Sequence, residues 1–261
     1  MASGPSGAST GEYEAAERRD GEPARFSGRG TQKVCADIEK IILPAIRGLD
    51  VSFQRALDLR LCELDGTENK SRLGANAILA VSLAAARAAA NAYEMPLYRY
   101  LGGIYGSVSM PVPMMNILNG GRHADNNIDI QEFMIVPVGA QTISEAVRIG
   151  SEVYHALRAT LQKEGYATSV GDEGGFAPDL SDDEAAIELI LKAIETAGYT
   201  TDEVKITLDA AASEWTANDG YLLPKRGTKY TSAQLIAYWE KLCEKYPICS
   251  IEDPLGEEDW P

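Results

Sequence analysis

Acidic residues follow two apolar segments of the chain at the point where each segment ends. Asp209 comes directly after residues 205–208, and Glu252 and Asp253 come after residues 248–251. In barrels of parallel strands the chemistry takes place at the carboxyl ends of the strands, and carboxylate oxygens are the ligands that Mg²⁺ prefers. Two acids at matching ends of neighbouring strands therefore predict a shared cation. The alternative is that each acid starts a turn, which the proline after Asp253 favours.

A second group of candidate residues surrounds a loop rich in glycine and asparagine. If the strand candidates on either side of this loop pair antiparallel, as a connection without a helix favours, the start of the second lies beside the end of the first. Gln131, Glu132 and His123 then share the face that carries Asp209. A lone loop histidine is usually solvated, and this alternative stays open for His123. His155, inside a predicted helix, is interpreted as structural.

The segment 171–175, Gly-Asp-Glu-Gly-Gly, places an acid pair between glycines, which allow the backbone to approach a ligand closely. Two acids that meet on one face, such as Glu132 and Glu173, repel each other, and one should hold its proton near neutral pH. A carboxyl group in that state can serve as a general acid. The alternative is a flexible loop between helices. A dinucleotide-binding interpretation is weak, because the pattern is not GxGxxG.

The residues of other catalytic chemistries are missing from the pattern. No Ser/His/Asp or Cys/His order indicates a nucleophilic triad, and no Cys/His cluster indicates zinc. Residues 3–11, which include Ser9, are small, polar and rich in glycine. They are typical of a flexible tail or linker, with a mobile lid as the minority interpretation.

The composition of the chain argues against some classes of protein. The chain has 261 residues, 24 Lys and Arg against 39 Asp and Glu, and a formal net charge of −15. The acid excess argues against nucleic acid or an anionic membrane as the main partner. The longest apolar run, residues 77–86, is about half of the roughly 20 residues that a membrane span needs, so it predicts a buried helix. No classical secretory signal is visible, and four cysteines without close spacing indicate reduced thiols in a cytoplasmic protein.

The first part of the chain, residues 1–108, is predicted to be a mostly helical domain. Thr31 is expected to cap a helix that ends before Pro44, and a second helix should stop at Gly66. Residues 73–92 are apolar nearly all round, so this helix should lie deep in the fold. A change of character near residues 105–109 marks the predicted domain boundary.

Residues 109–261 alternate short apolar strands with helices, which predicts an α/β sheet or barrel. The strand candidates are residues 112–118, 132–136, 205–208 and 248–251. The helix signals are the capping pairs Thr142 and Glu145, Ser181 and Glu184, and Thr231 and Gln234. The order is therefore β, β, α, α, β, α, β. A closed (β/α)₈ barrel needs eight strands, and four would leave two apolar edges, so we expect a partial barrel from a truncated chain.

Seven segments of the chain carry a family pattern in a fixed order: PSGASTGEYEA (5–15), NKSRLGANAILAVSLA (69–84), NILNGGRHADN (116–126), IQEFMIVP (130–137), GDEGGFAPD (171–179), LDAAASEW (208–215) and SIEDP (250–254). Together they resemble enolase (phosphopyruvate hydratase), particularly the bacterial type, from residue 5 to residue 261. The resemblance implies an α+β capping domain, of which residues 1–108 would be a mostly helical remnant, followed by a barrel of ββαα(βα)₆ order. It also implies a carbon–oxygen lyase of glycolysis that reversibly dehydrates 2-phospho-D-glycerate to phosphoenolpyruvate.

The resemblance assigns roles to the acids found above. It implies two Mg²⁺ ions per active site, with Asp209 and Glu252 as ligands of the tighter ion and Ser9, in a lid, as a ligand of the second. Glu173 would be the proton donor and Glu132 its partner. The substrate would be held by His123 and Gln131, together with Glu132.

Three parts of the family pattern do not occur in this sequence: the opening strands, a third acidic metal ligand, and the Lys base with the Arg and Ser that grip phosphate. We therefore expect the 261-residue chain to be inactive by itself. The resemblance further implies a homodimer or octamer in the cytoplasm, with cell-surface or signal-free secreted forms. The alternatives are another acid–sugar dehydratase or racemase on the same barrel, and a non-catalytic binding protein.

Overall fold

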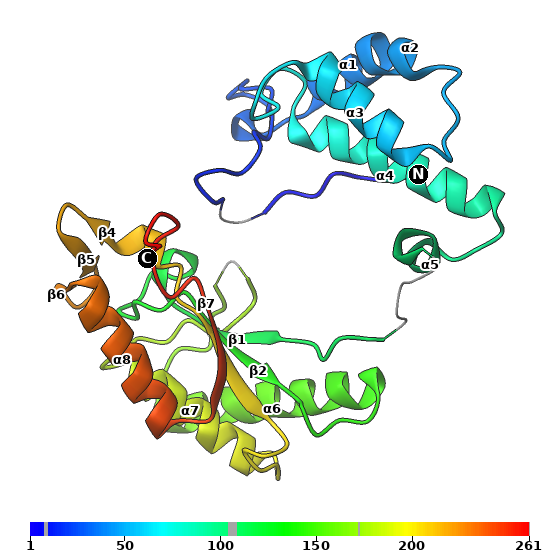
Figure 1. The fold of residues 1–261 in the computed structure, drawn as a ribbon. Coiled ribbons are helices and arrows are strands. Elements are labelled where there is room, and N and C mark those ends of the chain that lie inside the picture. The colour runs from blue at the N-terminus through cyan, green and yellow to red at the C-terminus, as the bar shows by residue number, and fades with distance from the viewer. Residues whose placement is uncertain (8–9, 104–108, 172, 261) are drawn as a thin grey trace. The chain divides into compact units, whose positions relative to one another are not determined.

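The computed structural model describes residues 1–7, 10–103, 109–171 and 173–260. The chain divides into two compact units, Met1–Ser109 and Met110–Pro261, which are described separately (Figure 1). The domain boundary predicted after residue 108 stays a prediction, because residues 104–108 lie outside the described part.

The described residues of the first unit form helices and turns. Its elements are η1 (Phe26–Gly28), α1 (Gln32–Asp37), the π-helical turn η2 (Ile38–Ile42), α2 (Leu43–Ile46), α3 (Gln54–Asp65), α4 (Ala75–Ala92) and α5 (Leu97–Gly102). A small apolar core joins α1, η2, α3 and α4 through buried side chains such as Val34, Ile42, Leu57, Leu61 and Ala77. Gly66 ends α3 in the left-handed conformation, as the sequence predicts.

Two details at the start of this unit differ from the sequence-based expectation. Pro44 does not end the helix, because it lies in the first turn of α2, where its missing N–H is tolerated. Thr31 precedes α1, but its side chain makes no capping hydrogen bond. Asp20 does this instead: its carboxylate accepts the backbone N–H of Gln32 at 2.8 Å and of Lys33 at 2.9 Å. These bonds, with that of Lys33 contributing most, lower the pKa of Asp20.

The apolar helix α4 is less deeply buried than the sequence predicts. Ala77, Ala86 and Ala89 are buried, but Leu79 is 49% exposed. By length and composition alone, α4 could cross a membrane, and it is the one helix within the described ranges that could. Of this helix, 39% is buried inside the structure. A single such helix is weak evidence, since core helices pass the same test. The absence of a membrane span stays a prediction.

The second unit is built on a four-stranded sheet. Its elements are β1 (Met115–Asn119), η3 (Gly121–His123), β2 (Glu132–Val136), α6 (Ile143–Glu164), α7 (Asp183–Thr196), β3 (Lys205–Asp209), η4 (Ala212–Trp215), β4 (Thr216–Ala217), β5 (Gly220–Leu223), β6 (Thr228–Tyr230), α8 (Ser232–Lys245) and β7 (Ile248–Glu252). The strand order is β1-β2-β3-β7, with β2 antiparallel to both neighbours and β7 parallel to β3.

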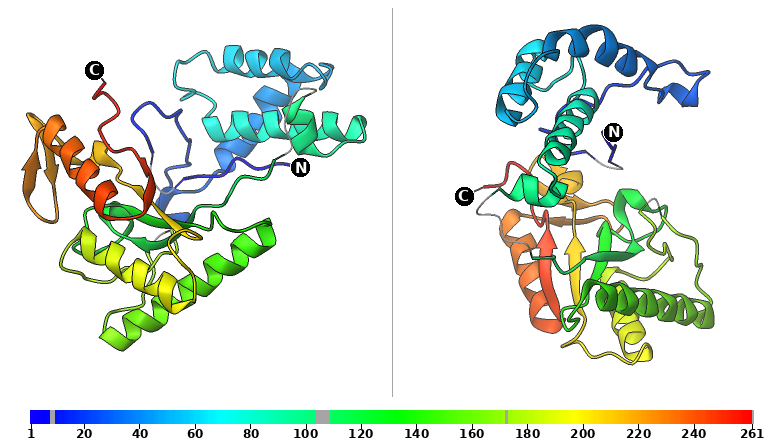
Figure 2. Two further views of the ribbon diagram at one scale, coloured as in Figure 1. Left: turned by 60° about the horizontal axis from the view of Figure 1, so that its bottom comes forward. Right: turned by 90° about the vertical axis from the view of Figure 1, so that its right-hand side faces the viewer.

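Helices α6, α7 and α8 lie on one face of this sheet (Figures 1 and 2). Phe133, Ile135, Ile206 and Leu208 are fully buried in the core that includes residues of these helices. Each such side chain contributes roughly 1.5–3 kcal/mol by leaving water. The sheet is open, with β1 and β7 at its edges. Its β, β, α, α, β, α, β order confirms the predicted partial barrel.

One small sheet and one helix cap differ from the sequence-based expectation. A second sheet, β4-β5-β6, lies between β3 and α8 and has no counterpart in the predicted order. Its strands have two to four residues, too few for a clear alternation of apolar and polar residues. The N-cap of α7 is Asp182, not Ser181, and accepts the N–H of Ala185. The capping box of Thr231 and Gln234 is confirmed in α8.

The buried face of helix α6 does not include the first apolar residues of the helix. Its N-cap Thr142 accepts the N–H of Glu145, as expected. Ile143 and Val147, however, are 40% and 54% exposed. The buried face of α6 instead begins at Ala146 and Ile149.

Candidate active site

Glu132, Asp209 and Glu252 lie in one row across three neighbouring strands. Glu132 on β2 is the register partner of Asp209 on β3, and Asp209 is the register partner of Glu252 on β7. Register partners project from the same face of a sheet, and adjacent strands lie about 4.8 Å apart. The structure therefore brings together the two acids that the sequence places at strand ends, and Glu132 lies in the same row, as the predicted antiparallel pairing expects.

The pKa values of these three acids are raised by burial and by nearby negative charges. Burial, and then the negative charges of Asp209, Glu173 and Glu252, raise the pKa of Glu132 to about 7. Burial also raises the pKa of Asp209. The pKa of Glu252 is raised by burial and by Asp209 and Asp253. A site of this kind favours a bound proton or cation, either of which relieves the repulsion.

The carboxylate of Asp209 is held between two donors. Its Oδ2 accepts a hydrogen bond from Nε2 of Gln131 at 3.3 Å, and its Oδ1 accepts the backbone N–H of Ala211 at 3.0 Å. The backbone N–H of Gln131 also donates to the carbonyl of Asp209 at 3.0 Å. Gln131, predicted to bind substrate, thus orients a predicted metal ligand in this structure.

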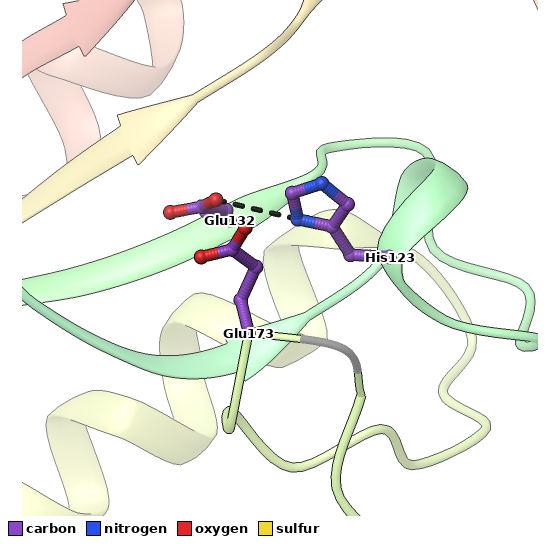
Figure 3. Close-up of side chains that lie close together, drawn as sticks. All are labelled: His123, Glu132 and Glu173. Atoms are coloured by element: carbon purple, nitrogen blue, oxygen red, sulfur yellow. Dashed lines mark ion pairs between the residues drawn. The ribbon is translucent and has the colours of Figure 1, made fainter. Parts of the chain in front are cut away.

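His123, Glu132 and Glu173 form a second cluster at the same end of the sheet (Figure 3). Each offers one ligand atom, and these atoms lie within 4.8 Å of one another. Nδ1 of His123 lies 3.3 Å from Oε1 of Glu132. His123 is 5% exposed, so it is not the solvated loop histidine of the alternative interpretation. Ser9, the third predicted metal ligand, lies outside the described residues.

The segment that carries Glu173 is anchored on both sides. The N–H of Gly171 donates to the carbonyl of Gly175 at 2.8 Å, and the N–H of Phe176 donates to Ile117 of β1 at 2.9 Å. The hydroxyl of Tyr154 on α6 donates to the carbonyl of Gly174 at 3.1 Å. These bonds disfavour the alternative of a loop without fixed structure.

Close packing explains why the flanking residues of this segment are glycines. A Cβ on Gly171 would lie 2.5 Å from the carbonyl oxygen of His123. A Cβ on Gly175 would lie 2.6 Å from Oδ1 of Asn119 and 2.8 Å from the backbone nitrogen of Leu118. Real Cβ contacts are essentially never this short. Residues without a side chain therefore let the segment approach β1 and the loop of His123.

A buried ionic network, which no sequence pattern predicts, supports the backbone just before Gln131. Asp183 is fully buried and accepts the backbone N–H of Asp129 and of Ile130. Arg226 bonds to both Asp129 and Asp183. Burial raises the pKa of Asp183 despite this partner. Since the three side chains come from residues up to 97 positions apart, no local pattern indicates them.

A cavity of about 460 Å³ adjoins the site. Gln131 and Ala211 line it, together with Arg122 and Glu214. These last two residues of the lining form an ion pair, with 2.5 Å between Nη1 of Arg122 and Oε1 of Glu214. This volume suits a small molecule, and Gln131 joins the cavity to the row of acids.

The fold and the site define a class: a barrel-type enzyme with carboxylates at the carboxyl ends of its strands, where such folds perform their chemistry. Comparison with known families agrees. Residues 107–261 match the family model for the C-terminal TIM barrel domain of enolase, and residues 1–101 match that for the enolase N-terminal domain. The chain belongs to the enolase family, whose members are lyases. Its second unit is part of that family's TIM barrel.

Proposed function

We propose that this protein carries out the enolase reaction, the reversible dehydration of 2-phospho-D-glycerate to phosphoenolpyruvate in glycolysis. The observation that supports it most directly is the meeting of Glu132 and Glu173, beside the register partners Asp209 and Glu252. The reaction needs a proton donor for the departing hydroxyl and positive charge for a developing dianion. The two parts of the site correspond to these two needs.

The carboxylate groups of Asp209 and Glu252 are suitable ligands for Mg²⁺. Both present carboxylate oxygens on one face of the sheet, and burial, followed by the negative charges of neighbouring acids, raises the pKa of each. Asp209 is further oriented by Gln131 and Ala211. When bound, Mg²⁺ supplies Lewis-acid stabilisation of the negative charge that develops on the substrate carboxylate. Ser9 is proposed as a ligand of a second ion.

The carboxyl pair supplies the proton. Because the pKa of Glu132 is raised to about 7, Glu132 retains a proton near neutral pH, beside Glu173. Glu173 is exposed, whereas Glu132 is half-buried. The exposed member can reach a substrate oxygen, so Glu173 is proposed as the donor, with Glu132 sharing its proton. His123 and Gln131 are proposed to position the substrate.

A base must remove the proton from the adjacent carbon, and enolase-superfamily enzymes use a Lys or His for this step. His123 is the one histidine in the described cluster, and we propose that it binds the substrate. We therefore propose that the 261-residue chain alone does not turn over. An assay of phosphoenolpyruvate formation, monitored by ultraviolet absorbance, tests this proposal. It compares the chain alone with a longer protein that also supplies the Lys base.

The expected result is Mg²⁺-dependent turnover by the longer protein and none by the 261-residue chain. In the longer protein Glu173→Gln should lower kcat at least roughly hundredfold, the size of a general-acid contribution. Turnover that needs no divalent ion, or that survives this substitution, would contradict the proposed mechanism. Conversion of a sugar acid without phosphate, and not of 2-phosphoglycerate, would favour the dehydratase alternative.

Assembly and location extend the proposal. We propose a homodimer or an octamer in the cytoplasm, with additional forms at the cell surface or secreted without a signal peptide. Light scattering of the purified protein checks the first statement. Fractionation of intact cells, with detection of the protein in the cytoplasmic and surface fractions, checks the second.

A further inference from the structure

Arg226 joins two buried carboxylates that come from distant parts of the chain. The side chains of Asp129 and Asp183 are fully buried, and Arg226 donates to both: its Nε lies 3.1 Å from Oδ2 of Asp129, and its Nη2 bonds to Asp183. Arg226 lies in the turn between β5 and β6, Asp129 precedes β2, and Asp183 is the first residue of α7. A planar guanidinium fixes the direction of each bond as well as its strength. These three residues, the buried network, therefore hold three elements together.

Each carboxylate of the buried network also holds the backbone of another element. Oδ1 of Asp183 accepts the N–H of Asp129 at 2.9 Å and that of Ile130 at 3.2 Å. Oδ1 of Asp129 accepts the N–H of Lys225 at 2.8 Å. Without Arg226 the two acids would be buried, unpaired and mutually repelling. The position of residues 129 and 130 therefore depends on Arg226.

Ile130 directly precedes Gln131, the residue that orients Asp209. Nε2 of Gln131 donates to Oδ2 of Asp209 at 3.3 Å, and the backbone N–H of Gln131 donates to the carbonyl of Asp209 at 3.0 Å. The carbonyl of Gln131 accepts the N–H of Gly120 at 2.9 Å. The side-chain bond is already at the long end of the usual range, so a shift of about half an ångström would lose it. Small movements of residues 129 and 130 would therefore reach Asp209.

These contacts form a continuous path from the small sheet to the row of acids. We propose that Arg226 is a positioning residue: through the buried network it holds Gln131 against Asp209. The turn between β5 and β6 thereby sets the geometry of a site that it does not touch. One consequence rests on the proposed function, namely that the affinity of the chain for Mg²⁺ depends on Arg226. The positioning itself does not depend on which substrate the protein uses.

Hydrogen exchange of backbone N–H groups, followed by NMR in the full 261-residue chain, tests the positioning directly. Arg226→Lys is the variant, because it keeps the positive charge and loses the planar fork. We expect exchange at residues 129–131 to become at least roughly tenfold faster relative to exchange in the middle of α6. A role in global stability alone would instead accelerate exchange in both places equally.

Calorimetric titration with Mg²⁺ tests the consequence for metal binding. Gln131→Ala should weaken binding roughly tenfold, as the loss of a group that orients a ligand does, and Arg226→Lys roughly fivefold. The double variant should bind no more weakly than Gln131→Ala alone, because Arg226 acts through Gln131.

Two control variants should leave Mg²⁺ binding within about twofold. Arg148→Lys makes the same change at an arginine of α6 that is paired with Glu152. Ile190→Val weakens the core at a fully buried residue of α7, so it separates the effect of lower stability from that of positioning.

The proposal is overturned if exchange at residues 129–131 changes no more than exchange in α6. It is likewise overturned if the chain binds Mg²⁺ and Arg226→Lys leaves the affinity unchanged, or if the effects of Arg226→Lys and Gln131→Ala add. Should Arg226→Lys not fold, Asp183→Asn gives the exchange comparison, because its neutral amide accepts weaker bonds from residues 129 and 130. A chain that binds no Mg²⁺ would refute the proposed metal ligands, and the exchange rates would then decide the role of Arg226 by themselves.

Discussion

Glu132 lies directly opposite Asp209 across the antiparallel strands β2 and β3. Burial makes it costly to charge a carboxylate on this half-buried face, and the repulsion between two carboxylates in register adds to that cost. This is why the pKa of Glu132 is raised to about 7. The same juxtaposition favours a bound proton or cation at this end of the sheet, which is what the proposed function requires.

The raised pKa of Glu132 makes the stability of the chain depend on pH. Between its unfolded value of 4.5 and its folded value of about 7, the folded state binds more protons than the unfolded state. The free energy of unfolding should therefore fall as pH rises through this window, by roughly 3 kcal/mol at most. Urea unfolding from pH 4.5 to 8 measures it. Glu132→Gln should flatten this part of the curve, and an unchanged slope would refute the assignment.

Removal of Asp209 should lower the pKa of Glu132. Asp209→Asn keeps the shape of the side chain and removes one negative charge that raises that pKa. Carbon NMR of the Glu132 carboxyl group as a function of pH checks this. The matched control is Glu145→Gln, in the first turn of α6, which should leave the pKa of Glu132 unchanged. A pKa of Glu132 that rises or stays constant in Asp209→Asn would contradict the electrostatic account.

Mg²⁺ affinity should depend on Glu252 and not on its neighbour. Glu252 ends β7 as the register partner of Asp209, whereas Asp253 lies beyond the strand in the left-handed conformation, with a φ of 45°. Calorimetric titration of the chain should show that Glu252→Gln weakens Mg²⁺ binding roughly tenfold, whereas Asp253→Asn changes it less than about twofold. If the two substitutions weakened binding equally, a general negative field rather than specific ligands would be responsible.

Arg226 should be essential for stability. Arg226→Ala leaves Asp129 and Asp183 buried without their cationic partner, which costs about 3–5 kcal/mol. Chemical unfolding measures the loss. The double substitution Arg226→Ala with Asp183→Asn should recover part of it, because one unpaired charge is removed. A loss below about 1 kcal/mol, typical of an exposed ion pair, would argue against this network.

Gly175→Ala should displace the segment of Glu173. The added methyl group meets Oδ1 of Asn119 and the backbone of β1, so we expect a loss of about 1–3 kcal/mol of stability. The pKa of Glu132, followed by carbon NMR, should fall in Gly175→Ala, because displacement of Glu173 removes one of the negative charges that raise it. Gly165→Ala is the control, because its Cβ would meet nothing within 4 Å and only its φ of +83° is strained. Equal changes in the pKa of Glu132 for the two variants would contradict the close-packing argument.

Much of the fold follows from local pattern. The strand Glu132–Val136 has the predicted bounds, and the capping pair Thr231 and Gln234 marks the start of α8. These features depend on residues near each other in the chain, where periodicity and capping chemistry act. The short strands β4, β5 and β6 are not predicted, although each pairs with its neighbour in the chain, because strands of two to four residues are too short to show a clear alternation of apolar and polar residues.

The sequence by itself determined which residues could do chemistry: acids that end strands, an acid between glycines, and a histidine in a glycine-rich loop. Only the tertiary structure decided which of them meet. Register placed Glu132 opposite Asp209, while η3 and the segment after α6 brought His123 and Glu173 to Glu132. It also buried His123 without a hydrogen-bond partner among the described residues. Distances and burial arise from packing between segments far apart in the chain, and they set the charges and affinities of these groups.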